Sequence, residues 1–268
     1  MIAWKFKLWR TAGAAAVLGL AACGGEGGEA GAAGEAGEAA VSSPAGEAGE
    51  AAAGEGGGEF GEAGISAAFA GVAGDQRTAL QLQRLKGFVL IAARTAETGA
   101  PTEASVLVAQ GLLEVYDPAS EQFGGFDPAP VRVAAGHDLT PAQLAQRLRA
   151  ASAAIDAART TLDIDHADLT LRMLDVATGL YQSVHQPDFI DPLEYQHSFG
   201  AALAARDALA AGRRSLRPRN AAAYDEGIAE FDRFIGLWPQ TSAPEQPSTY
   251  QSVLAQSSRV RLALSPLL

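Results

Sequence analysis

The residues best suited to chemistry lie in one short segment. It contains His185, Asp188, Asp191, Glu194 and His197. Glu194 and His197 are three positions apart, and this spacing places both side chains on one face of a helix, as in the Glu-x-x-His pairs of helical metal sites. We therefore predict that His185, Asp188, Glu194 and His197 bind a transition metal ion. An alternative stays open, because Asp191 and Glu194 also suit a variant capping box at a structural helix junction.

Familiar catalytic patterns are missing from the sequence. A di-iron centre of the helical-bundle type needs a second Glu-x-x-His on another helix, and the chain has none. It also lacks Gly-x-Ser-x-Gly, His-Glu-x-x-His and a phosphate-binding glycine loop. We predict no catalytic residues and expect a protein that is not an enzyme.

One basic cluster could bind a partner. Its members are Arg213, Arg214, Arg217 and Arg219. They could dock an anionic partner or the glutamate-rich segment of this chain. Alternatively, they lie just after a helix and offset the negative end of its dipole.

A long connection over residues 117–139 contains the run Phe123-Gly124-Gly125-Phe126. Long loops inside compact domains are uncommon and are often functional. Phe123 and Phe126 could therefore form a lid or a partner-binding loop. They could equally be buried rings of a segment packed over the domain.

From Asp75 onward the apolar residues recur with helical periodicity, which predicts that helices position the residues named above. Candidate capping residues are Asp75, Thr140, Asp191 and Asn220. No strand-like alternation of useful length occurs. The expected helices cover about 75–98, 101–116, 140–162, 165–186, 191–211, 220–238 and a last one opening at 247–248. The predicted fold is all-α, an antiparallel bundle of about six to seven helices that forms one domain over residues 74–268.

Residues 24–73 have a different composition. They consist mainly of Gly, Ala and nine Glu, contain no Lys or Arg, and repeat Ala-Gly-Glu-Ala-Gly-Glu-Ala-Ala at 33–40 and 45–52. Such a segment buries too little apolar surface to offset the entropy of ordering it. We predict a disordered tether here.

The first 22 residues carry a basic start and a short apolar run that ends in Leu20-Ala21-Ala22-Cys23. This motif resembles the lipobox of bacterial lipoproteins. The resemblance implies that residues 1–22 are a signal peptide and that Cys23, the one cysteine of the chain, is lipidated. Gly24 in place of Asp implies the outer membrane of the cell envelope, with the domain facing the periplasm. The alternative is an ordinary secretory signal cut near an incidental cysteine.

Charge argues against nucleic acid as a partner. The whole chain has a net charge of −11. Removing residues 1–22 takes away Lys5, Lys7 and Arg10, so 17 basic residues stand against 31 acidic ones, a net charge of −14. Nucleic-acid binding depends on neutralising phosphates, which such a chain does not favour.

The helical part resembles imelysin-like lipoproteins and the periplasmic part of iron permeases. The resemblance rests on Tyr181, Val184, Ile190, Asp191, Glu194-Tyr195-Gln196, Phe199, Leu85-Lys86-Gly87-Phe88 and Glu114-Val115-Tyr116. It implies a helical fold tied to metal uptake, iron above all. Where that family would have histidines in its first half, this chain has Phe88 and the histidine-free run 106–116.

Together these features favour a lipid-anchored, non-enzymatic binding protein with an unidentified protein or small ligand as partner. A periplasmic hydrolase related to peptidases and a structural tether of the cell envelope are the alternatives.

Overall fold

The computed structural model describes residues 59–268, with side chains described from residue 63, and this part of the chain is all-α, as predicted. Within it, an isolated bridge between His185 and Ile190 is the one β-type pairing. The α-helices are α1 (Glu59–Phe69), α2 (Gly74–Glu97), α3 (Pro101–Gly111), α4 (Ala129–Ala134), α5 (Pro141–Arg159), α6 (His166–Gln182), α7 (Pro192–Ala211), α8 (Arg213–Leu216), α9 (Ala221–Ile235) and α10 (Tyr250–Leu264). The other helical segments are η1 (Leu112–Tyr116), η2 (Asp117–Phe123) and η3 (Ser265–Leu267).

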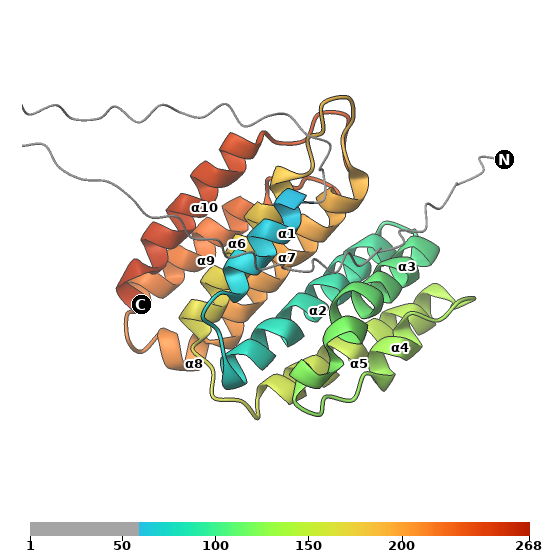
Figure 1. Ribbon diagram of the computed structural model, residues 1–268, viewed down its shortest axis with the longest axis horizontal. Helices are drawn as coiled ribbons and strands as arrows, with labels where there is room; N and C mark the ends of the chain where they lie inside the picture. Colours follow the sequence, from blue (N-terminus) through green and yellow to red (C-terminus); the bar gives the residue numbers. More distant parts are fainter. Residues whose placement is uncertain (1–58) are drawn as a thin grey trace, which may run out of the picture. The chain divides into compact units, whose positions relative to one another are not determined.

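The antiparallel pair α6 and α7 forms the centre of the bundle (Figure 1). On one side α9 and α10 pack against this pair, and on the other side α2 packs along α7. The helices α3 and α5 lie on the far side of α2, with α4 on α5. Thus α2 connects the two halves of the bundle.

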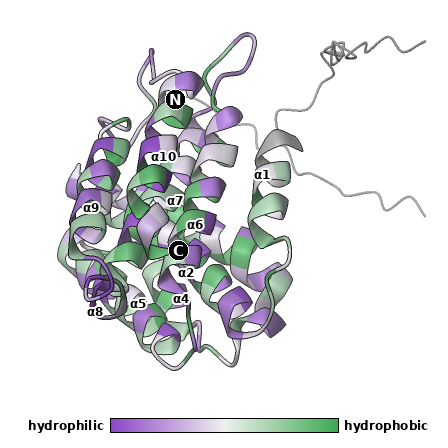
Figure 2. Cartoon of the chain, turned by 90° about the vertical axis from the view of Figure 1, so that its left-hand side faces the viewer, coloured by the Kyte–Doolittle hydropathy of each residue, from purple (hydrophilic) through white to green (hydrophobic). Residues whose placement is uncertain are grey.

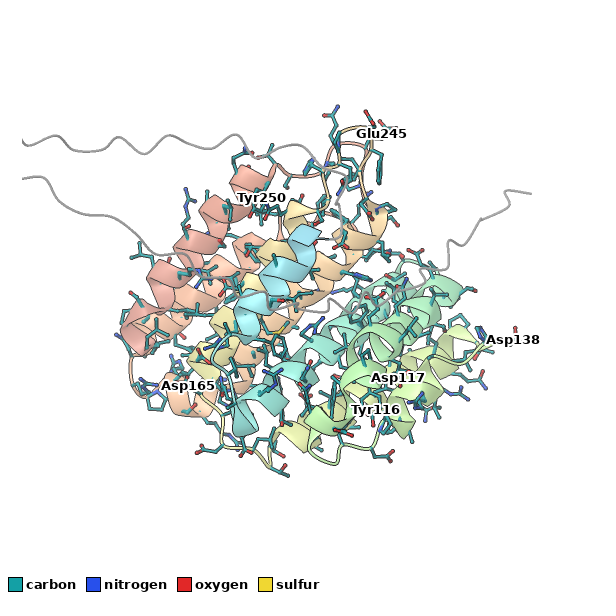
Figure 3. The ribbon with its side chains drawn as sticks, viewed as in Figure 1. Tyr116, Asp117, Asp138, Asp165, Glu245 and Tyr250 are labelled. Atoms are coloured by element: carbon teal, nitrogen blue, oxygen red, sulfur yellow. The ribbon has the colours of Figure 1, made fainter. Side chains whose placement is uncertain are left out.

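Local capping chemistry fixes several helix starts. The side chains of Thr140, Asp191 and Asn220 accept hydrogen bonds from the backbone N–H groups of their first turns, which confirms these three predicted N-caps. Asp165, labelled in Figure 3, caps α6 in the same way. Asp75 differs from the prediction: it lies inside the first turn of α2, and its carboxylate accepts the backbone N–H of Asp163 at 2.9 Å.

The end of the predicted tether is helical. Residues 59–69 form α1, which packs on α6, so the helical domain begins before residue 74. Composition gave no sign of this, because α1 combines glycine and glutamate with few large apolar side chains. The predicted signal peptide, Cys23 and residues 24–58 of the predicted tether lie outside the described residues.

The long connection is structured rather than irregular. A π-helix, η1, continues α3, and the 3₁₀-helix η2 follows it and ends at Phe123, just before Gly124, whose φ is 59°. Tyr116 and Asp117, labelled in Figure 3, mark the junction of η1 and η2. The short α4 then leads to α5.

Hydrophobic residues gather where the helices face one another, and hydrophilic residues lie mainly on their outer turns (Figure 2). None of the helices in residues 59–268 combines the length and the hydropathy that a membrane-spanning segment needs.

Candidate functional site at the α2–α7 crossing

The structure divides the four predicted metal ligands into two pairs. His185 and Asp188 are exposed in the turn between α6 and α7, where Nε2 of His185 lies 2.9 Å from the carbonyl oxygen of Ser248. Glu194 and His197 lie near the start of α7, where Glu194 is half-buried and His197 is buried. Across residues 59–268, no three His, Cys, Asp or Glu side chains are grouped so that they could hold a metal ion. The predicted set of four is therefore not assembled in this structure.

Glu194 does not complete the expected capping box. Asp191 accepts the N–H groups of Leu193 and Glu194 at 2.9 and 3.1 Å, as an N-cap should. The N–H of Asp191 itself donates to the carbonyl oxygen of Val184 at 2.8 Å, so it is not available to the Glu194 carboxylate. Oε2 of Glu194 is buried and accepts no hydrogen bond.

Two glycines let α2 and α7 cross at close range. A Cβ added to Gly87 would lie 2.9 Å from the carbonyl oxygen of Gly200, and one added to Gly200 would lie 2.8 Å from that of Gly87. Arg84 and His197 lie three positions before these glycines, one turn away on each helix. The crossing thus brings a half-buried cation and a buried imidazole close together.

The π-helix η1 supplies the third member of the site. Its i→i+5 hydrogen bond joins the N–H of Asp117 to the carbonyl oxygen of Leu112. Such wide turns occur often at functional sites. Phe88 packs so tightly on Gly111, just before η1, that a Cβ there would lie 2.6 Å from the Cβ of Phe88. This contact holds η1 beside α2 and directs Glu114 toward Arg84 and His197.

We call Arg84, Glu114, Glu194 and His197 the crossing cluster. Oε2 of Glu114 lies 3.8 Å from Nδ1 of His197, and the ring of Phe88 packs edge-on against the imidazole at 4.8 Å. A cavity of about 40 Å³ adjoins Arg84, Glu114 and His197. Such a space suits a single ion or a few waters. Its apolar wall consists of Ile65, Phe88, Ile91, Met173, Val176 and Leu180.

Burial shifts the pKa of every member. Burial, together with the smaller effect of the positive charge of Arg84, lowers the pKa of His197 to about 4. Burial raises the pKa of Glu194 to about 7, with Asp191 and Glu114 adding to the shift. The pKa of Glu114 is also raised by burial, against the attraction of Arg84, while burial lowers the pKa of Arg84 to about 10.

Two buried polar atoms near this crossing have no hydrogen-bond partner. They are Nε2 of His197 and Oε2 of Glu194. Leaving such atoms unpaired is costly, so a cluster of them calls for an explanation. A neutral imidazole beside two carboxylates of raised pKa can accept a hydrogen bond from a ligand or bind a cation.

A second set of charged side chains forms an ion-pair network whose members bind one another. Nζ of Lys86 lies 2.5 Å from Asp156 and 2.8 Å from Asp207, and the guanidinium of Arg159 reaches the same two carboxylates at 2.8 and 3.3 Å. Gln83 adds hydrogen bonds to Asp207 and Arg159. Two positive and two negative charges satisfy one another here. We therefore assign this network to stability.

The two predicted partner-binding groups have different positions. Phe123 and Phe126 are buried and pack against Tyr116, with centroids 4.9 and 6.2 Å away, so the interpretation as packed rings is correct and they form no exposed loop. The four arginines are exposed at α8 and the turn after it, and within the described residues only Arg217 among them forms an ion pair, with Asp225 at 3.0 Å.

The sequence did not indicate Arg84 or the glycine pair as parts of a site. Glu114 did enter the resemblance, through Glu114-Val115-Tyr116, together with Glu194 of the second half. In the structure Glu114 is close enough to Glu194 to raise its pKa. Comparison with protein-family models, with curated proteins and with solved structures finds no match to this chain.

Proposed function

We propose that this protein is a lipid-anchored, non-enzymatic binding protein of the bacterial periplasm and that its crossing cluster binds a transition metal ion. The lipobox-like Leu20-Ala21-Ala22-Cys23 supports anchoring, and Gly24 favours the outer membrane. The resemblance to imelysin-like and iron-permease domains favours iron as the physiological metal.

The observation that carries the metal assignment is the state of His197. Its imidazole is buried, its Nε2 has no partner, and its pKa of about 4 keeps it neutral at neutral pH. A metal ion competes with protons for imidazole, so a histidine of low pKa needs no deprotonation before it binds. Imidazole nitrogen suits iron, copper and zinc.

Carboxylates complete the donor set. Glu114 and Glu194 would bring oxygen ligands and negative charge to the cation that His197 binds. The present conformation holds no group of three ligands within residues 59–268, so binding requires these side chains to rotate toward the imidazole. Since the pKa of Glu194 is about 7, a bound cation would release its proton, and affinity should rise as the pH increases through that value.

Metal titration of the full chain in detergent tests the proposal. We expect Fe²⁺, Cu²⁺ or Zn²⁺ to bind more tightly than about millimolar, with a stoichiometry near one. His197→Asn should weaken binding strongly, whereas His185→Asn, which changes an exposed histidine of the same segment, should have no effect. Absence of binding, or equal affinities of the parent chain and His197→Asn, would refute the assignment and leave the structural-tether alternative in place.

A further inference from the structure

The helix α1 forms part of the wall of the crossing cluster. Ile65 lines the same cavity as Arg84, Glu114 and His197. One turn later, the ring of Phe69 lies under two guanidinium groups, with centroid distances of 5.5 Å to Arg77 and 5.6 Å to Arg84. Arg84 is therefore in contact with an aromatic ring of α1 while it interacts with Glu114 of η1.

At Gly64 the backbone of α1 meets the backbone of α6 with no side chain between them. A Cβ added to Gly64 would lie 2.6 Å from the Cα of Gly179 in α6, and one added to Gly179 would lie 2.7 Å from the Cα of Gly64. The two backbones therefore touch directly. Such a contact is sensitive to a single methyl group, because a packed interface resists added volume.

The C-terminal end of α1 is fixed more firmly. Nη1 of Arg172 donates to the carbonyl oxygens of Ala68 and Ala70 at 2.8 and 3.2 Å, while Nε of the same guanidinium binds Asp168 at 2.7 Å. The following connection contains Gly71 and Gly74, with φ values of 70° and 56°. Residues other than glycine rarely adopt such angles, so the turn between α1 and α2 depends on these two glycines.

From these contacts we propose that α1 is the movable wall of the crossing cluster: it pivots at residues 70–74, and its tilting away from α6 opens the path to His197. The part that concerns ligand entry depends on the proposed function. The movement of α1 itself does not, because the accessibility of His197 can be measured without a ligand.

Chemical modification of His197 in the full chain provides that measurement. Diethyl pyrocarbonate acylates neutral imidazole, and Nε2 of His197 is buried, so the rate of its modification reports opening. Gly64→Ala should favour the helical backbone of α1 but block its docking on Gly179. We expect modification of His197 to become about tenfold faster, since added volume at a packed contact displaces the helix. Modification of the exposed His137 should stay constant.

Ser66→Ala is the matched control, because it also raises helix propensity but changes an exposed position of α1. It should leave the rate at His197 unchanged. Ile65→Ala removes part of the cavity wall without touching the glycine contact and should also accelerate modification, so the test survives if Gly64→Ala does not fold. Unchanged rates in folded Gly64→Ala and Ile65→Ala, or an equal increase in Ser66→Ala, would overturn the proposal.

Protection by Zn²⁺ tests the proposed function separately. If the metal slows modification of His197 in the parent chain, the cluster binds it. If the metal does not protect His197 while Gly64→Ala still accelerates the reaction, α1 is a movable wall but the metal assignment is wrong.

Discussion

Replacing Lys86 with Met tests the closed ion network that joins α2, α5 and α7. The side chain of Lys86 is 2 % exposed, and methionine has a similar length without the charge. The substitution therefore removes the ammonium group while it largely conserves the packing. Asp156, Asp207 and Arg159 stay in place.

The expected change in the free energy of unfolding combines two destabilising effects, charge repulsion and hydrogen-bond loss, with one stabilising effect, the avoided burial of a charge. Both carboxylate oxygens lie within 2.8 Å of Nζ, so without it two negative charges face each other at about 5 Å or less. Their repulsion is about 3 kcal/mol at an effective dielectric constant near 20. Asp156 and Asp207 are 43 % and 28 % exposed, and Arg159 still binds both, so water and that guanidinium reduce the repulsion.

Loss of the hydrogen bond that the ammonium donates to Asp156 adds to the destabilisation, whereas avoiding the burial of that charge offsets part of it. We expect a net loss of about 2 kcal/mol in the free energy of unfolding, since breaking a fully buried pair costs about 3–5 kcal/mol and this one is partly exposed.

Urea unfolding followed by circular dichroism measures the change. Arg206→Gln is the control: it breaks the ion pair with Asp232, which is 58 % exposed, and should change stability by about 0.5 kcal/mol or less. A Lys86→Met chain as stable as the parent would refute the reasoning. It would show that the cost of burying the ammonium equals what its ion pairs contribute.

Three further substitutions extend the test to the site and the core. Gly87→Ala places a methyl group 2.9 Å from the carbonyl oxygen of Gly200, and calorimetry should show a loss of about 1–3 kcal/mol together with weaker metal binding. Glu194→Gln removes a carboxyl group whose folded pKa is raised to about 7 from an ordinary 4.5; that group contributes stability below pH 4.5 which is lost as the pH rises to 7. The variant should therefore gain about 1–2 kcal/mol relative to the parent between pH 5 and pH 8 in unfolding experiments, and a constant difference would contradict the shift. Phe123→Ala should cost about 3–5 kcal/mol by chemical denaturation, because its ring is buried, and a neutral effect would argue for an exposed loop.

The parts of the fold that depend on residues close together in the sequence were predictable from it. Thr140, Asp191 and Asn220 cap helices through hydrogen bonds that span two or three positions, so their residue types suffice to identify them. Helix α1 was missed because its docking depends on Gly179, more than a hundred positions away, rather than on an apolar stripe of its own.

The candidate site was only half predictable for the same reason. Glu194 and His197 lie near the start of α7, as the capping residue Asp191 indicated, but the third residue beside them comes from η1 and not from a second Glu-x-x-His. Neither the π-turn that positions Glu114 nor the crossing of Gly87 and Gly200 leaves a signal in a single sequence. The burial of Lys86 depends likewise on carboxylates from two other helices.

Because of the π-turn in η1, inserting or deleting one residue can create or remove the carboxylate of the site. A π-turn holds one residue more than an α-turn, so it corresponds to an insertion and not to a substitution. Each residue of a helix advances the side-chain direction by about 100°. Deleting Leu113, which is 68 % exposed, would move Glu114 from its place beside His197, where its side chain is 41 % exposed, to this more exposed position. A single codon lost or gained in this turn would then remove or restore the carboxylate of the site, while every residue type in the cluster stayed the same.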